Sequence, residues 1–130
     1  MMTKDEFLRL EQPVIRTRKI YVDLTGDLLT AILLSHIIDW HQMDRDGSTR
    51  LQVQRDGQLW LARTQKQWSA EIRLSEKQVH RCLGVLTGLG LIEQRIFKFN
   101  NAPIGHVRIV WDVLQAKVKK LLDSDGIDVM

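Results

Sequence analysis

The sequence predicts an α+β fold, mainly helical with a small β component, and three observations lead to this prediction. Residues 27–42 are strongly apolar with helical spacing. Two S/T-x-x-Q sequences, at Thr64 and Ser75, are each typical of a helix start. Strand-forming stretches with turn sequences lie on either side of that pair, at residues 51–61 and 93–111. With 130 residues, the chain is long enough for one core and short for several.

The composition excludes several classes of protein. A single cysteine, Cys82, rules out an intramolecular disulfide framework and a cysteine-rich zinc site. The least polar stretch, residues 28–40, contains four polar residues and is shorter than a membrane span. Lys4, Asp5 and Glu6 stand where the apolar part of a signal peptide would begin. We therefore expect a cytoplasmic protein with no cofactor and no membrane partner.

The first predicted elements are a short helix and an arm. Thr3 and Glu6 have the spacing of a capping box, which starts a helix that ends before Pro13. Residues 14–23 mix β-branched and aromatic residues with basic ones. We expect an exposed strand or an extended arm there.

A long helix is predicted over residues 27–42, with Thr25 as its N-cap and Asp27 in its first turn. Two apolar stripes run along this helix. The first contains Leu28, Leu29, Ile32, Leu33, Ile37 and Trp40, and the second contains Ala31, Leu34 and Ile38. A helix with two such stripes is buried on more than one side, either in the core of one domain or in a subunit contact. Residues 43–50 are polar and are expected to form a loop.

A hairpin and a pair of helices are predicted next. Strands at residues 51–54 and 58–61 are joined by a turn at Asp56 and Gly57. The two capping boxes then start two helices with the spacing of a helix-turn-helix unit. The second helix has an apolar face with Val79, Cys82, Leu83 and Leu86, and an opposite face with Lys77, Arg81, Gly84 and Gly88. The basic residues therefore point away from the core.

A second hairpin and a last helix complete the chain. After a helix end at Gly90, a strand over residues 93–99, a turn over residues 100–105 and a strand over residues 106–111 are expected. The last strand places Val107, Ile109 and Trp111 on one face. A helix from about Asp112 has the apolar stripe Leu114, Val118, Leu121 and Leu122, and an acidic tail follows Asp123.

The net charge is only +3, but it is unevenly distributed. Residues 57–111 contain eight Lys and Arg against three Glu, a net charge of +5, so the other segments sum to −2. Clustered cations bind polyanions because they release counterions from phosphates. A solvated basic surface explains the same numbers more simply, so the charge needs the support of a motif.

The order of helix, strand, helix-turn-helix and hairpin resembles the winged helix-turn-helix family of DNA-binding domains over residues 24–112. The segment LSEKQVHRCLGVLTGLGLI, residues 74–92, is similar to the family's recognition helix and the entry to its wing. The segments LTGDLLTAILLSHIIDWHQ, GQLWLARTQKQWS and FNNAPIGHVRIVW are similar to N-terminal domains of replication initiators and primosomal proteins from phages, plasmids and integrative elements. Outside this domain we expect an N-terminal helix and arm over residues 1–23, and a C-terminal helix and acidic tail over residues 113–130.

The resemblance implies a set of DNA contacts. The second helix of the pair would enter the major groove, and the first would cross the DNA backbone. The expected contacts are Ser75, Lys77, Gln78 and Arg81 in the recognition helix, Thr64, Gln65, Lys66 and Arg73 at the backbone, and Arg95, Lys98, Asn100, Asn101 and Arg108 in the wing. Helix capping is the alternative role of Thr64 and its neighbours, and a solvated face is the alternative for Lys77 and Arg81.

Catalysis and base stacking receive little support. His36 and Asp39 share a helical face, but the sequence has neither a zinc-binding HExxH pair nor a nucleophile-base signature, so we expect no enzyme and no metal site. The four tryptophans, Trp40, Trp60, Trp68 and Trp111, lie in apolar patterns that favour core packing over a stacking platform for single strands.

The main hypothesis is a non-catalytic protein that binds double-stranded DNA during replication initiation of a mobile element, and is nucleoid-associated when bound. A winged-helix transcriptional regulator is the alternative within DNA binding. A module that binds another replisome protein is the alternative from a different class. A homodimer through the long or the last helix is also expected, because these two helices carry surplus apolar surface.

Overall fold

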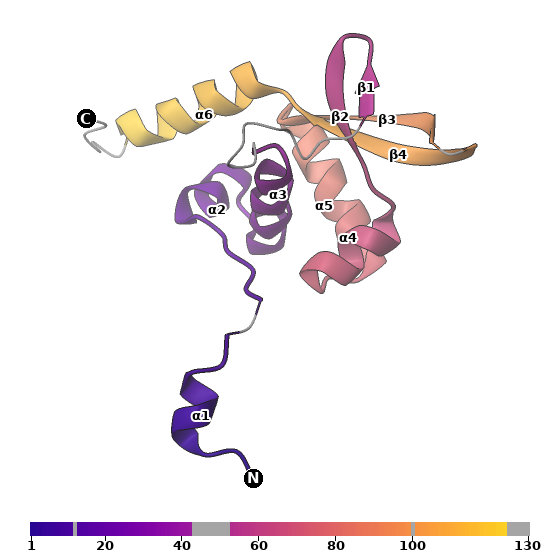
Figure 1. Cartoon of the computed structure of the whole chain (residues 1–130). Coiled ribbons are helices and arrows are strands. Elements are labelled where there is room, and N and C mark those ends of the chain that lie inside the picture. The colour runs from indigo at the N-terminus through magenta and orange to yellow at the C-terminus, as the bar shows by residue number, and fades with distance from the viewer. Residues whose placement is uncertain (12, 43–52, 100, 125–130) are drawn as a thin grey trace.

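A computed structural model describes residues 1–11, 13–42, 53–99 and 101–124, and these residues have the expected α+β class (Figure 1). The helices in the described chain are α1 (Lys4–Leu8), α2 (Lys19–Thr25), α3 (Leu28–Trp40), α4 (Gln65–Ile72), α5 (Glu76–Gly88) and α6 (Trp111–Ser124). The strands are β1 (Val53–Arg55), β2 (Gln58–Ala62), β3 (Ile92–Phe99) and β4 (Ala102–Ile109). The expected loop at 43–50 and the tail from residue 125 lie outside the described residues.

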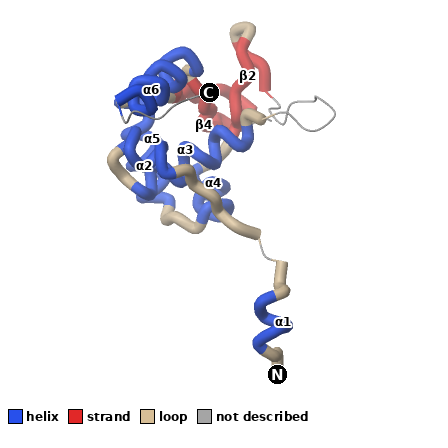
Figure 2. The backbone as a smooth tube through the Cα atoms, turned by 90° about the vertical axis from the view of Figure 1, so that its left-hand side faces the viewer, coloured by secondary structure: helices blue, strands red, loops and turns tan. Residues whose placement is uncertain are grey.

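The N-terminal helix stands apart from the other elements. Thr3 caps α1, its hydroxyl accepting from the amide of Glu6 at 3.1 Å, as the capping-box spacing predicts. Residues 13–18 have no regular secondary structure and are mostly exposed. Figures 1 and 2 both show α1 at the far end of this arm, away from the rest of the chain. The short helix and the first half of the predicted arm are therefore confirmed.

The second half of the predicted arm is helical, so the expectation of extended chain over residues 14–23 is wrong there. Helix α2 forms because Tyr21 and Leu24 share one face that packs on α3 and α6. It ends at Gly26, whose φ of 72° is the left-handed conformation that glycine adopts easily. The expected boundary between residues 23 and 24 thus falls inside a helix.

Helix α3 is capped by Asp27 and not by Thr25. The Asp27 carboxylate accepts from the Thr30 amide at 3.3 Å, whereas Thr25 is the last residue of α2. The Thr25 hydroxyl donates to the carbonyl of Tyr21 at 2.8 Å. The prediction of Thr25 as the cap is wrong because α2 was not predicted, and Thr25 is the last residue of that helix.

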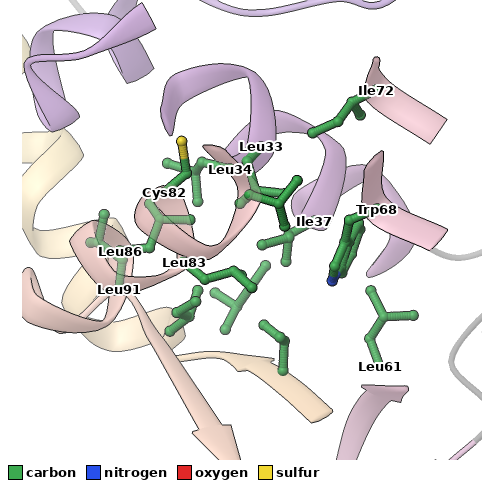
Figure 3. Close-up of a cluster of buried hydrophobic side chains, with 14 of the residues drawn as sticks. Leu33, Leu34, Ile37, Leu61, Trp68, Ile72, Cys82, Leu83, Leu86 and Leu91 are labelled. Atoms are coloured by element: carbon green, nitrogen blue, oxygen red, sulfur yellow. The ribbon is translucent and has the colours of Figure 1, made fainter. Parts of the chain in front are cut away.

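The core surrounds α3, whose burial on several sides confirms the expectation from its two stripes. Ala31, Leu33, Leu34 and Ile37 are all fully buried. Helix α3 packs against α2, α4 and α5, and α5 packs in turn against β3. Figure 3 shows side chains from α3, α4 and α5 meeting Leu61 of the sheet in this cluster.

The sheet is antiparallel with strand order β1-β2-β4-β3. The first hairpin is confirmed from Val53 onward, where Arg55 pairs with Gln58 across the two residues Asp56 and Gly57; residues 51–52 of its predicted first strand lie outside the described residues. Both turn residues have positive φ, 52° and 74°, as the tight hairpin turn that matches strand twist requires. Strand β2 pairs with β4 only through Leu61 and Ala62, so most of its length extends beyond the second hairpin.

The second hairpin is longer than expected. Phe99 pairs with Ala102, so residues 102–105 belong to β4 and not to the predicted six-residue turn. Pro103 lies beyond the part of β4 that pairs with β2, and such a one-sided position tolerates proline in a strand. Asn101 has a φ of 66°, which asparagine adopts more readily than most residues, and Asn100 lies outside the described residues.

Trp111 does not share the buried face of Val107 and Ile109. Strand β4 ends at Ile109, the Val110 amide donates to the carbonyl of Leu91 at 2.9 Å, and Trp111 starts α6 with 43% of its surface exposed. The alternation continues through residue 111 in the sequence, but the backbone has already turned into a helix. The expected domain boundary between residues 112 and 113 accordingly falls inside α6.

A second cluster, which we call the outer aromatic cluster, joins the two hairpins. It consists of Trp60, Phe97, Phe99 and His106. The Trp60 and Phe97 rings meet edge to face at 5.3 Å, and the Phe97 and His106 rings do so at 5.1 Å. Trp60 and His106 are buried but do not belong to the main core. The β1–β2 hairpin is therefore fixed to β3 and β4 by packing.

We expect replacement of Trp60 by Ala to lower the free energy of unfolding by about 3–5 kcal/mol, because a large buried ring is removed. Leu59 on the same strand is 41% exposed and provides the matched control. Replacing Leu59 by Ala should cost about 0.5 kcal/mol or less. Urea denaturation of both variants measures the difference, and equal losses would show that the outer aromatic cluster contributes nothing.

Candidate nucleic-acid interface

Two reciprocal caps fix the starts of α4 and α5. The Thr64 hydroxyl accepts from the Gln67 amide at 3.0 Å, and the Gln67 side chain accepts from the Thr64 amide at 2.9 Å. Ser75 and Gln78 repeat this arrangement at 3.1 and 2.9 Å. Both predicted capping boxes are confirmed. The caps occupy the hydroxyls of Thr64 and Ser75 and the side-chain oxygen of Gln78, whereas the Nε2 atom of Gln78 takes no part in its cap.

The connection between α4 and α5 is a tight turn at Arg73. Its φ of 61° places it in the left-handed conformation that ends α4. The Ser69 hydroxyl donates to the carbonyl of Leu74, a buried residue, and the Arg73 guanidinium donates to the carbonyl of Ala70. The Arg73 side chain is exposed but folds back on its own helix end.

Helix α5 has the two faces that its sequence predicts. Val79, Cys82, Leu83 and Leu86 are buried, and Lys77, Arg81, Gly84 and Gly88 are exposed. A Cβ added at Gly84 or Gly88 would meet no atom within 4 Å. Packing within the described chain therefore does not require these glycines, which disfavour a helix. They leave a smooth, open strip along the exposed face.

Arg81 forms an ion pair with the residue that caps α3. Its guanidinium lies 2.9 Å from the Asp27 carboxylate, and 49% of the Arg81 side chain is exposed. The hydrogen bond from Thr30, followed by the contact with Arg81, holds the pKa of Asp27 below its ordinary value. Arg81 thus faces solvent from a position where its charge is already compensated.

The start of α4 reaches α5 through one side-chain contact. The Gln65 amide nitrogen lies 3.0 Å from the Nδ1 atom of His80. Gln65, Lys66 and His80 are all exposed. Lys66 and Lys77 form no ion pair with any residue in the described ranges, so their charges remain available.

Arg95 and Arg108 of the second hairpin are neutralised locally. Both contact Glu93, Arg95 at 2.7 Å and Arg108 at 2.8 Å, and Arg95 also lies 3.7 Å from Asp56. The hydrogen bond from Arg108, together with the charge of Arg95, lowers the pKa of Glu93. Both guanidinium groups lie over Trp60, at 5.7 to 5.9 Å from its ring. These arginines therefore belong to the structure of the hairpins.

Lys98 and Asn101 are exposed, as is Arg95, but unlike Arg95 they form no ion pair with any described residue. The backbone carbonyl of Lys98 accepts from Arg55 at 2.9 Å. Gln94 connects this hairpin to α5, donating to the Thr87 hydroxyl at 2.7 Å and to the Leu83 carbonyl at 3.3 Å. The hairpin therefore has a fixed position beside α5.

Sequence reasoning missed a polar cluster around Glu71. Its carboxylate accepts from Trp40 at 3.3 Å and lies 2.7 Å from the Nε2 atom of His36 and 2.9 Å from the Nε atom of Arg63. The Arg63 guanidinium also covers the Trp40 ring at 4.1 Å. Arg63 and Glu71 lie far from α3 in the sequence, so their place in the cluster could not be predicted. The i, i+4 spacing of His36 and Trp40 does indicate that these two residues share a helix face. The cluster ties α4 and the end of β2 to α3.

Neither a metal cluster nor a single membrane-spanning helix is present in the described residues. No group of three or more His, Cys, Asp or Glu side chains is placed to hold a metal ion in this part of the chain. No single described helix has the length and apolarity to cross a membrane. Helices α2 and α3 would have sufficient length and apolarity only as a pair, and the chain bends by 119° between them. Compared with protein-family models, with curated proteins and with solved structures, the chain gives no match.

We expect replacement of Asp27 by Asn to lower stability at neutral pH, because Asn keeps the helix cap but removes the charge facing Arg81. The charge of Asp27 stabilises the fold fully above the pKa of a carboxyl in the unfolded chain. That contribution is lost as the pH falls through the lower pKa of the folded state. The difference between wild type and variant should therefore shrink below about pH 4 in urea denaturation. A difference that stays constant with pH would contradict a charge effect.

Proposed function

We propose that this protein binds double-stranded DNA, with α5 as the helix that enters the major groove. One observation carries the proposal. The face of α5 opposite the core is exposed, carries Lys77 and Arg81, and is interrupted by two glycines whose open surroundings no internal packing explains. A smooth helix face with basic side chains admits close approach of a DNA backbone.

The order of elements supports a winged helix-turn-helix domain as the finer description of the fold. Helix α3, strand β2, the pair α4 and α5, and the β3–β4 hairpin follow one another in the sequence. The tight turn at Arg73 separates the two helices of the pair, and Gln94 holds the hairpin beside the second of them. Strand β1 is an addition to this order of elements, and it pairs with β2 to form a separate hairpin.

The geometry divides the predicted contact residues into two groups. Lys66, Lys77 and Lys98 have no ion-pair partner among the described residues, and their charges suit phosphates, which lysine binds as a point charge. Arg81 has a carboxylate partner that it must exchange for a base or a phosphate. Arg95 and Arg108 would have to leave Glu93, so we assign them to positioning the wing and not to direct contact.

We place this DNA binding in replication initiation of a mobile element, on the resemblance to initiator and primosomal domains. Neighbouring genes that encode replication proteins would support this role, and neighbouring regulated operons would favour a transcriptional regulator. Binding to a replisome protein without binding to a duplex would instead favour the protein-interaction module.

We expect Lys77→Ala and Lys66→Ala each to weaken binding to all duplex sequences alike. Each should reduce the slope of log affinity against log salt concentration by about 1, because one phosphate contact is lost. Fluorescence anisotropy titrations of a labelled duplex at several salt concentrations measure both quantities. Lys120→Ala, at an exposed position of α6, is the matched control and should leave the slope unchanged. Equal effects of all three variants would contradict the assignment to α4 and α5.

Asp27 competes with DNA for Arg81, which gives a second prediction. Asp27→Asn should bind duplex severalfold more tightly than wild type although it is less stable, because Arg81 is released. Arg81→Ala should lose about 1–3 kcal/mol of binding free energy on the preferred site if Arg81 reads a base. The double variant should bind like Arg81→Ala alone, since the release then has no target. Tighter binding by the double variant would show that Asp27 acts by general repulsion of DNA.

A further inference from the structure

One exposed histidine, His80, lies between the two groups of expected DNA contacts on α4 and α5. The Gln65 Nε2 atom and the His80 Nδ1 atom meet at 3.0 Å. Gln65 and Lys66 belong to the expected backbone contacts of α4. Lys77 and Arg81 belong to the expected recognition contacts of α5. His80 was placed in neither group, because its spacing in the sequence does not indicate that α4 meets α5 there.

His80 borders the exposed face of α5. It follows Lys77 by three residues and precedes Gly84 by four, and residues at these spacings are neighbours on a helix surface. Gly84 has no side chain that could cover the imidazole, and its surroundings are open. Because Nδ1 faces Gln65, Nε2 is the ring nitrogen left for a ligand, and it forms no hydrogen bond with any described residue.

The charged groups near His80 do not provide it with an anionic partner. They are Glu76, Lys77 and Arg81 on α5 and Lys66 on α4. No carboxylate in the described chain, Glu76 included, lies within ion-pair distance of His80, and Arg81 is paired with Asp27. A phosphate beside the imidazole would be its first anionic neighbour. A neighbouring anion favours the charged form of histidine over the neutral form.

We propose that His80 takes up a proton from solvent when duplex DNA binds, and that the imidazolium donates from Nε2 to a DNA phosphate. This inference rests on the proposed function and adds a dependence on pH to it. Histidine is the side chain whose charge ordinarily changes between about pH 5 and pH 8. A phosphate contact at this position therefore couples DNA affinity to pH in the physiological range.

Gln65 suits both protonation states of the ring. When Nδ1 carries no hydrogen, it accepts from the amide nitrogen of Gln65. When Nδ1 is protonated, the Gln65 amide can turn about its last bond, and its oxygen then accepts from Nδ1. The contact between α4 and α5 is therefore kept in both states, and the added proton changes the charge of the surface without changing its shape.

Fluorescence anisotropy titrations of a labelled duplex at fixed salt, between about pH 8 and pH 6, test this inference. Wild-type affinity should rise as the pH falls, by about tenfold at most for each pH unit, because one proton at most is taken up. His80→Gln should bind more weakly and lose this dependence. His80→Lys, whose charge is fixed, should bind tightly throughout. Lys77→Ala is the matched control, and should weaken binding at every pH but keep the dependence.

The outcomes distinguish failure of this inference from failure of the proposed function. Absence of duplex binding by the wild type at every pH would refute the proposed function, and the role of His80 with it. Duplex binding that does not change with pH, or a pH dependence that His80→Gln retains, would overturn the role of His80 alone. Calorimetric titrations in two buffers of different ionisation enthalpy count the protons, and uptake by the wild type should exceed uptake by His80→Gln.

Discussion

The packing of α3 is the interaction on which the positions of the other elements depend. Its apolar side chains fix it between α2, α4 and α5, and a polar contact secures each end. At its start, Asp27 holds Arg81 of α5. Toward its end, His36 and Trp40 hold Glu71 of α4. Because both helices of the pair are attached to one rigid neighbour, the exposed face of α5 has a defined orientation.

The distribution of ion pairs separates cations that serve the fold from cations that remain free for a ligand. Arg81, Arg95 and Arg108 all have carboxylate partners, whereas Lys66 and Lys77 have none among the described residues. Exposed ion pairs of this kind add little stability, because solvent screens them. Their larger effect on the proposed interface is to lower nonspecific attraction, since a phosphate must displace a carboxylate before an arginine can contribute.

The features that the sequence predicts correctly are those that depend on neighbouring residues. The two capping boxes, the Asp56-Gly57 turn and the apolar face of α5 each follow from a few adjacent side chains. Features that depend on distant segments were predicted wrongly or not at all. Helix α2 needs α3 and α6 as packing partners, and the length of β4 depends on its pairing with β3 as far as Phe99 and Ala102. Among the predicted site residues, spacing alone identifies the exposed ones, but the partner of Arg81 lies 54 residues earlier.

The outer aromatic cluster makes the two hairpins one rigid body, and Gln94 attaches that body to α5. A flexible wing loses conformational entropy when it is ordered on a duplex, and this loss subtracts from affinity. In the proposed DNA complex, a β3–β4 hairpin that is already packed in this way would lose less entropy on binding. The additional β1–β2 hairpin thus acts as a structural brace. It would keep the proposed wing in register with α5 before any DNA binds.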